Sequence, residues 1–146
     1  MTTARLEADR VLYQEVQQFY ARQMRYLDEG AVREWAATFT EDGVFAANAH
    51  PEPQRGRKAI EEGARAAAAK LEADGIQRRH WLGMLDVTET DGTITARTYA
   101  LIINTPLDGQ AAVHVSCSCE DVLIREEGRL KVSRRQVYRD DIRKDG

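Results

Sequence analysis

The sequence predicts an α+β domain in which three N-terminal helices pack on one face of a curved, mostly antiparallel sheet and enclose a pocket. Apolar residues recur with helical spacing up to residue 75, whereas β-rich segments separated by short glycine-containing breaks follow from residue 78. The chain has 146 residues, of which 42% are hydrophobic. That length suits one buried core, so we expect a single domain over residues 1–146.

Helical periodicity predicts the first three elements. A helix over about residues 7–28 is expected from one apolar stripe: Leu12, Val16, Phe19, Tyr20 and Leu27. It should end at Glu29-Gly30, because glycine tolerates the left-handed turn that closes helices. A short helix over 32–39 follows, and a third ends at Gly75 and carries a further stripe: Ile60, Ala64, Ala67, Ala68 and Leu71.

The strands are predicted from β-favouring runs bounded by turn residues. A first strand should start near Gly43, after the turn residues 40–43. Four more are expected in series, over 79–88, 93–104, 111–125 and 129–139. The breaks between them have hairpin length, which predicts an antiparallel meander. Because residues 96–103 are bulky or apolar at most positions, we expect one sheet face to meet the helices and the other a second copy in a homodimer.

Composition excludes several classes of partner. The formal net charge is −3 and no long block of like charge occurs, which argues against nucleic acid and anionic membrane surfaces. No signal peptide is evident and no apolar run approaches the roughly 18 residues that span a bilayer, so a soluble, cytoplasmic protein is expected. Cys117 and Cys119 are two apart, which is typical of neither a redox pair nor a disulfide framework, so we expect reduced thiols near the core.

Three histidines and one aspartate are the candidates for proton transfer. His80 and His114 fall on predicted strands, and His50 lies in a proline-containing loop. Asp28 ends the first predicted helix, where the helix dipole disfavours negative charge. Pairing with a histidine across a cavity would explain an acid at that place, because the carboxylate would orient the ring and stabilise its protonated form. The alternative is that each is an isolated, solvated polar residue.

Period-two geometry predicts which residues share a strand face with each histidine. With His80 we expect Leu82, Met84 and Asp86. With His114 we expect Ser116, Ser118 and Glu120.

A planar ligand would suit an apolar pocket, for which the candidate lining residues are Tyr20, Met24, Trp35, Phe45, Trp81, Met84 and Tyr99. The alternative is that they are core residues. Four arginines lie at the ends of predicted strands: Arg78, Arg79, Arg134 and Arg135. Their positive charge could attract a phenolate or carboxylate ligand, or it could simply pair with acidic side chains.

Nucleotide, flavin, P-loop and hydrolase-elbow motifs are absent from the sequence, as are HExxH and CxxC. No closely spaced ligand pair supports a metal site. A cofactor-independent activity is therefore the better enzyme hypothesis.

Several segments resemble SnoaL-like proteins of the nuclear transport factor 2-like (NTF2-like) superfamily. They are residues 26–30 (Tyr-Leu-Asp-Glu-Gly), Trp35, residues 39–45 (Phe-Thr-Glu-Asp-Gly-Val-Phe), residues 56–60 (Gly-Arg-Lys-Ala-Ile) and Arg79-His80. The resemblance covers about residues 10–139. It implies a cone-shaped α+β fold with a deep pocket. Members include polyketide cyclases, dehydratases, ketosteroid isomerases, epoxide hydrolases and non-catalytic dioxygenase subunits, so fold alone leaves function open.

Within that superfamily the pattern of scytalone dehydratase fits best, since its aspartate and two strand histidines fall on Asp28, His80 and His114. The resemblance implies that His80 is the general base or acid and that His114 and Asp28 hold and charge the site. It also places a polar pocket residue near Gln136. The tyrosines that activate a carbonyl in that enzyme are not reproduced, because Leu27 precedes Asp28 and the first strand ends on Phe45-Ala46. Tyr26 or Tyr99 is a candidate replacement.

Three functions follow from these observations. The first is a cofactor-independent dehydratase or cyclase that transfers protons next to a carbonyl of an aromatic or polycyclic polyketide-type intermediate. The second is a non-catalytic binding protein or accessory subunit with the same fold. The third is an epoxide hydrolase with a water activated by Asp28 or Asp86.

Overall fold

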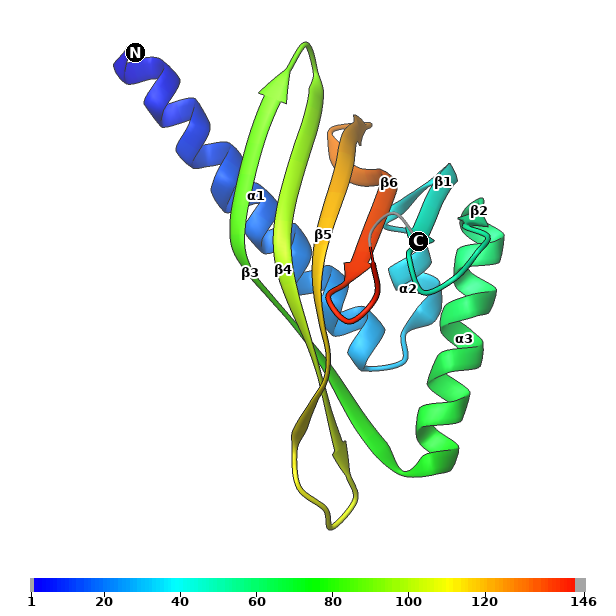
Figure 1. The fold of residues 1–146 in the computed structure, drawn as a ribbon. Helices are drawn as coiled ribbons and strands as arrows, with labels where there is room; N and C mark the ends of the chain where they lie inside the picture. Colours follow the sequence, from blue (N-terminus) through cyan, green and yellow to red (C-terminus); the bar gives the residue numbers. More distant parts are fainter. Residues whose placement is uncertain (1, 144–146) are drawn as a thin grey trace.

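In the computed structural model, which describes residues 2–143, three helices pack on one face of a six-stranded sheet (Figure 1). The helices are α1 (Thr3–Asp28), α2 (Val32–Ala36) and α3 (Arg57–Asp74). The strands are β1 (Phe39–Ala47), β2 (Gln54–Arg55), β3 (Ile76–Thr90), β4 (Thr93–Pro106), β5 (Ala112–Glu126) and β6 (Arg129–Arg139). The predicted α+β class is confirmed.

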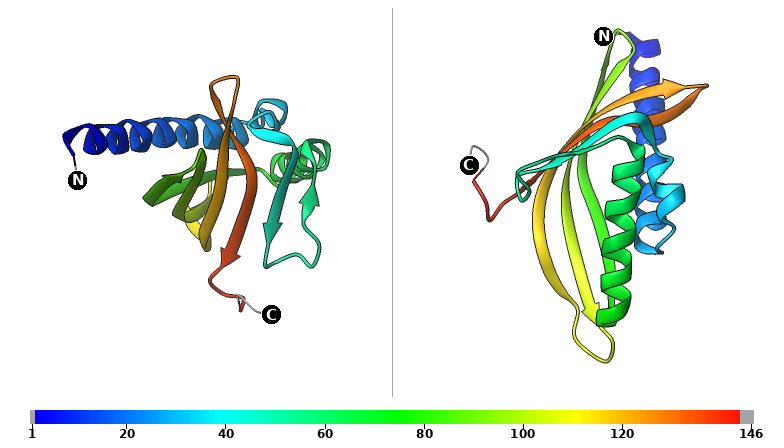
Figure 2. Two further views of the ribbon diagram at one scale, coloured as in Figure 1. Left: turned by 90° about the horizontal axis from the view of Figure 1, so that it is seen from above. Right: turned by 90° about the vertical axis from the view of Figure 1, so that its right-hand side faces the viewer.

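The sheet order is β2-β1-β6-β5-β4-β3. Strands β3 to β6 form the predicted antiparallel meander, and β1 joins it by pairing parallel to β6. The sheet curves around the helices, with α1 across its inner face and α3 beside β1 and β2 (Figure 2). The inner face of the sheet is therefore the one that the helices cover.

Local chemistry explains where the helices differ from the prediction. Helix α1 begins at Thr3 rather than residue 7, because the Thr2 side chain caps it by accepting the Arg5 backbone N–H at 3.2 Å. Helix α2 ends at Ala36, three residues early, because Phe39 already pairs with Val132 in β6. The first strand thus starts at Phe39 instead of near Gly43.

The predicted turns are confirmed at the ends of α3 and of two hairpins. Gly75 closes α3 with φ +66°, a left-handed conformation that glycine adopts without strain. The β3–β4 hairpin turns at Asp91-Gly92 and the β5–β6 hairpin at Glu127-Gly128, all four residues with positive φ. These turns fix the register of the meander.

The core lies between the helices and the inner face of the sheet. Its fully buried apolar side chains come from all parts of the chain: Val16, Phe39, Ile60, Ile94, Leu123 and Val132. A smaller cluster on the same face holds Ala100, Val115 and Cys117. Within residues 2–143, no helix has the length and apolarity that crossing a membrane requires.

Register shifts in β3 and β5 change which of their residues face inward. In β3 the register shifts between Gly83 and Asp86, where Met84 has φ +54°. In β5 it shifts because His114 is an extra residue between Val113 and Val115, which pair with Ile103 and Ile102. Each extra residue resets the alternation along its strand.

Candidate active site

A cavity of about 370 Å³ lies between the inner sheet face and the helices. Its apolar wall includes Met24, Leu27, Trp35, Phe45, Ala64, Leu82, Ala100 and Val137. Its polar wall includes all three histidines of the chain and several charged groups: His50, Arg78, His80, His114, Asp121, Arg135 and Arg139. An apolar chamber with a few polar side chains is the usual form of a small-molecule site.

His80 of this wall contacts the carboxylate of Asp28, which lies behind it and lines the neighbouring pockets. The His80 Nδ1 atom lies 2.5 Å from Asp28 Oδ1, and the His80 backbone N–H donates to Asp28 Oδ2 at 3.0 Å. The two side chains are 16% and 11% exposed. Asp28 lies at the end of α1 and His80 on β3, as predicted, and the fold brings the two side chains together.

The contact with Asp28 occupies one of the two ring nitrogens of His80. An ionised carboxylate only accepts hydrogen bonds, so beside an ionised Asp28 the shared hydrogen belongs to Nδ1. The other nitrogen, Nε2, is left for a ligand. His80 lines the cavity, and Asp28 holds the ring through Nδ1. The arrangement therefore suits a general base whose orientation is set by a neighbouring carboxylate.

The other two histidines line the same cavity without joining that pair. His114 is exposed and reaches the cavity because of the bulge in β5. Its expected face partner Ser116 instead lies on the outer face and donates to Asp140 at 2.6 Å. The predicted grouping of His114 with Ser116, Ser118 and Glu120 is wrong, because simple alternation does not allow for the extra residue.

The predicted apolar lining divides into two groups. Met24, Trp35 and Phe45 line the cavity, and the Trp35 and Phe45 ring centroids are 6.2 Å apart. Tyr26 instead lines a separate groove with Arg22 and Lys131. Its prediction as a pocket residue is therefore wrong.

Three predicted lining residues lie on the outer face of the sheet. Trp81, Met84 and Tyr99 are all exposed, Met84 by 79%. The bulge explains Met84, because the inward alternation of His80 and Leu82 resumes at Leu85. Trp81 and Tyr99 alternate with inward residues of β3 and β4 and so point away from the cavity.

Asp86 is also on the outer face, where its Oδ2 accepts from Arg97 at 2.6 Å. It is therefore not available to activate a water in the cavity, and this form of the epoxide-hydrolase hypothesis is wrong. The predicted pocket position at Gln136 is wrong by one residue, because Arg135 and Val137 line the cavity and Gln136 does not. The Gln136 amide donates to the Val137 carbonyl at 3.2 Å.

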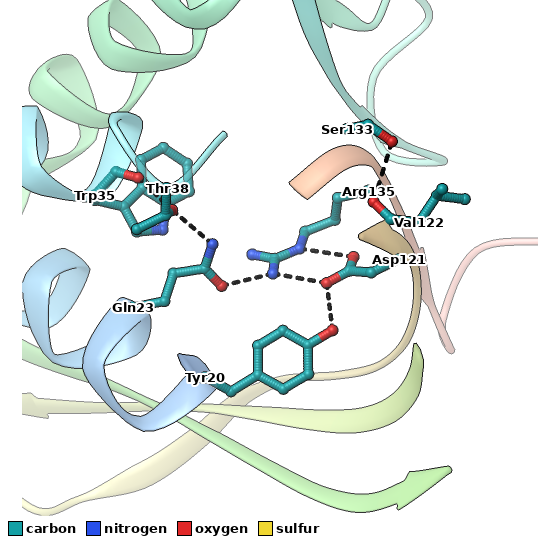
Figure 3. A network of polar contacts seen from close by, with 8 residues as sticks. All are labelled: Tyr20, Gln23, Trp35, Thr38, Asp121, Val122, Ser133 and Arg135. Atoms are coloured by element: carbon teal, nitrogen blue, oxygen red, sulfur yellow. Dashed lines mark hydrogen bonds and ion pairs between the residues drawn. The ribbon is translucent and has the colours of Figure 1, made fainter. Parts of the chain in front are cut away.

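A buried polar network was not predicted from the sequence (Figure 3). The Arg135 guanidinium donates to Asp121 through Nε at 2.9 Å and Nη2 at 2.8 Å. Tyr20 Oη donates to the same carboxylate at 2.6 Å, so Tyr20 serves this network rather than the cavity wall. Gln23 Oε1 accepts from Arg135 Nη2 at 2.6 Å, and its amide donates to Thr38 at 2.7 Å.

Burial sets the charge state of this network. Burial raises the pKa of Tyr20, and the neighbouring Asp121 carboxylate adds to that, so the phenol stays neutral. Burial alone would lower the pKa of Arg135, but the contact with Asp121 outweighs it and the net shift is upward. Burial also raises the pKa of the nearby Cys119 thiol to about 12, so it stays neutral and unreactive.

Arg78 also belongs to the polar wall. Burial lowers the pKa of its guanidinium, which donates to Asn104 at 2.9 Å and lies near Asp28. Among residues 2–143, no cluster of three or more His, Cys, Asp or Glu side chains is arranged to hold a metal ion.

Comparison with known proteins gives a consistent picture. A sequence profile of the SnoaL-like domain matches residues 10–136. No curated protein sequence matches the chain.

Solved structures match with high coverage. Aln2 from a Streptomyces species is 40% identical with a TM-score of 0.83, over 89% of this chain and 91% of that chain. A Catenulispora acidiphila protein in complex with S-DNPA is 43% identical with a TM-score of 0.78, over 90% and 95%. ActVI-ORFA from Streptomyces coelicolor is 35% identical with a TM-score of 0.82, over 90% and 98%.

Proposed function

The chain belongs to the SnoaL-like family of the NTF2-like superfamily, and from that premise we propose that it is a cofactor-independent dehydratase or cyclase. Its substrate would be an aromatic polyketide-type intermediate bound in the cavity. The reaction would be proton transfer next to a carbonyl of that intermediate, with His80 as the base and Asp28 as its partner.

The observation that carries the proposal is the His80–Asp28 contact in the cavity wall. Nε2 of His80 takes a proton from the carbon next to the carbonyl, and the C–H electron pair forms an enolate. Asp28 stabilises the imidazolium that results, because the ring then donates to a carboxylate. The imidazolium returns its proton to a leaving hydroxyl as water in a dehydration, or to carbon or oxygen in a cyclisation.

His114 would assist from a second position on the wall. It is exposed and lines the same cavity, so it can donate to or accept from a polar group of the ligand. A His114→Ala variant should weaken ligand binding more than it slows the chemical step.

The proposal is tested by binding and product analysis on one panel of compounds. The panel contains S-DNPA, named in the complex of the Catenulispora acidiphila relative, and hydroxylated naphthalenone analogues. We expect wild-type protein to bind and convert at least one of them. His80→Ala should bind it but lose at least about 100-fold in rate, the usual contribution of a positioned general base.

A second test and a control complete the set. Asp28→Asn keeps the size of the side chain but removes its charge, so it should also lose rate. Asp86→Asn makes the same change on the outer face, away from the cavity, and it should keep the rate. Full activity of His80→Ala would contradict the proposal. Tight binding without conversion by wild-type protein would instead identify a carrier or accessory subunit.

We also propose that the outer sheet face forms a homodimer. All three helices lie on the other face (Figure 2), and the outer face of β3, β4 and β5 exposes Trp81, Met84, Tyr99, Leu101 and Val113. A large exposed apolar patch is typical of a protein interface. Sedimentation should show a dimer at micromolar concentration and a monomer for Trp81→Lys. A wild-type monomer would contradict the proposal.

A further inference from the structure

The Asp121–Arg135 pair, drawn in Figure 3, forms a second polar position in the cavity wall, separate from His80. Strand β5 supplies Asp121 and strand β6 supplies Arg135, which are paired in register across the sheet. From α1, Tyr20 and Gln23 contact the pair as donor and acceptor. The guanidinium is therefore held by its bonds to Asp121 and Gln23 and cannot turn freely.

One donor edge of Arg135 is left over. A guanidinium has five N–H groups, and the three bonds to Asp121 and Gln23 use Nε and Nη2. No bond joins Nη1 to another residue of the described part of the chain. Within that part, the only fully enclosed side-chain N or O atom without a partner is Trp35 Nε1. Nη1 is therefore not fully enclosed, and because Arg135 lines the cavity we assign the free edge to that space.

Stability alone gives no reason for a buried pair at this place. Taking two charges out of water costs several kcal/mol per ion, and apolar residues of similar volume often stabilise a protein as well or better. A charged donor held rigidly beside an apolar chamber is, by contrast, what stabilises negative charge that develops on a ligand.

We propose that the free Nη1 edge of Arg135 binds the carbonyl oxygen of the substrate and stabilises the negative charge that forms on it. This inference rests on the proposed function, because it concerns the same reaction. When His80 takes the proton, the C–H electron pair becomes the new C=C bond and the carbonyl π pair moves to oxygen. Asp121 balances the guanidinium in the resting site and holds it in place.

The probe is 2-naphthol, whose ionised form carries negative charge on an oxygen attached to a conjugated ring, as an enolate does. Its absorbance distinguishes naphthol from naphtholate, so the pKa of the bound probe can be measured without knowing the substrate. We expect wild-type protein to favour naphtholate at least about tenfold, which is a shift of one pKa unit or more.

The decisive variant is Asp121→Leu/Arg135→Met, which removes both charges and leaves neither unpaired. It should fold and bind 2-naphthol without the preference for naphtholate. The matched control is Asp86→Leu/Arg97→Met, which removes an Asp–Arg pair from the outer face and should keep the preference. Arg135→Lys keeps the positive charge but not the planar guanidinium with its fixed N–H donors, and it should show an intermediate preference for naphtholate.

A further variant separates this inference from the proposed function. His80→Ala should keep the naphtholate preference while losing conversion of the substrate panel. If the preference disappears in His80→Ala but survives in Asp121→Leu/Arg135→Met, His80 stabilises the charge and the inference is overturned. The same holds if wild-type protein does not bind 2-naphthol or shows no preference. Conversion of the panel tests the proposed function in either case.

Discussion

Two Asp–Arg pairs occupy opposite faces of the same sheet and differ in almost everything but their chemistry. Asp121 and Arg135 on the inner face are 2% and 5% exposed, with an N–O distance of 2.8 Å. Asp86 and Arg97 on the outer face are 57% and 62% exposed, although their 2.6 Å contact is shorter. Burial, rather than contact distance, therefore decides how strongly such a pair affects stability, because water screens the outer pair.

The largest expected effect comes from removing one member of the inner pair. Asp121→Leu leaves Arg135 charged and buried without a carboxylate, so we expect a loss of about 3–5 kcal/mol in the free energy of unfolding. Urea denaturation measures it, with Asp86→Leu as the control on the outer face. Equal unfolding midpoints for the two variants would show that burial does not make the inner pair more important for stability than the outer pair.

The inner face should also impose a pH dependence through Cys119. Its thiol stays neutral in the folded protein up to about pH 12, whereas the unfolded thiol ionises near its ordinary pKa of 9.0. The stability it contributes is thus complete below pH 9 and is lost as pH rises toward 12, at up to about 1.4 kcal/mol per pH unit.

Denaturation of wild type and Cys119→Ala at pH 7, 9 and 10.5 checks this expectation. The wild-type advantage over the variant should shrink as the pH rises above 9. An advantage that is constant over that range would show that the thiol ionises equally in both states.

A smaller effect is expected for the phenol that supports the inner pair. Tyr20→Phe removes the 2.6 Å bond to Asp121 without changing the size of the ring much. Hydrogen bonds to charged groups contribute about 1.5–3 kcal/mol, so that loss of stability is expected. In the Asp121→Leu/Arg135→Met background the same substitution should cost much less, which a double-mutant cycle measures. An unchanged cost would mean that Tyr20 acts through packing alone.

The smallest effect is expected on the outer face. Arg97→Met should leave the urea midpoint unchanged in low and in moderate salt, because both partners are solvated without the contact. A midpoint shift comparable to that of Asp121→Leu would contradict this expectation, because a solvated pair cannot contribute as much as a buried one.

The elements of the fold could be predicted because their signals are local. Gly75, Gly92 and Gly128 mark turns that need positive φ, and β6 has the predicted bounds, 129–139. The parallel pairing of β1 with β6 was not predicted, because it joins residues as far apart in sequence as Val44 and Arg134. Local propensity carries no information on such pairing. Strand β2 was not predicted either, because its two residues are too few to form a recognisable β-favouring run.

The site was only partly predictable for a related reason. Asp28 and His80 were found because each is an unusual residue at an element end, and they are in contact. Met84, Asp86 and His114 were assigned by strict alternation, which a single extra residue in a strand overturns. Arg135 was considered only as a local charge, although the inward alternation Cys117, Cys119, Asp121 on the neighbouring strand was a usable signal for a buried acid that needs a cation.

The position of β6 between β1 and β5 has a consequence for how the protein is made. Strands β3, β4 and β5 can pair as hairpins while the ribosome is still at work, but β1 has no neighbour in the meander until residues 129–139 emerge. Until then one edge of β1 and one edge of β5 stay unpaired, so a chaperone has a defined interval in which to bind. Arg135 lies on β6, so the polar wall of the cavity is completed only when that strand emerges.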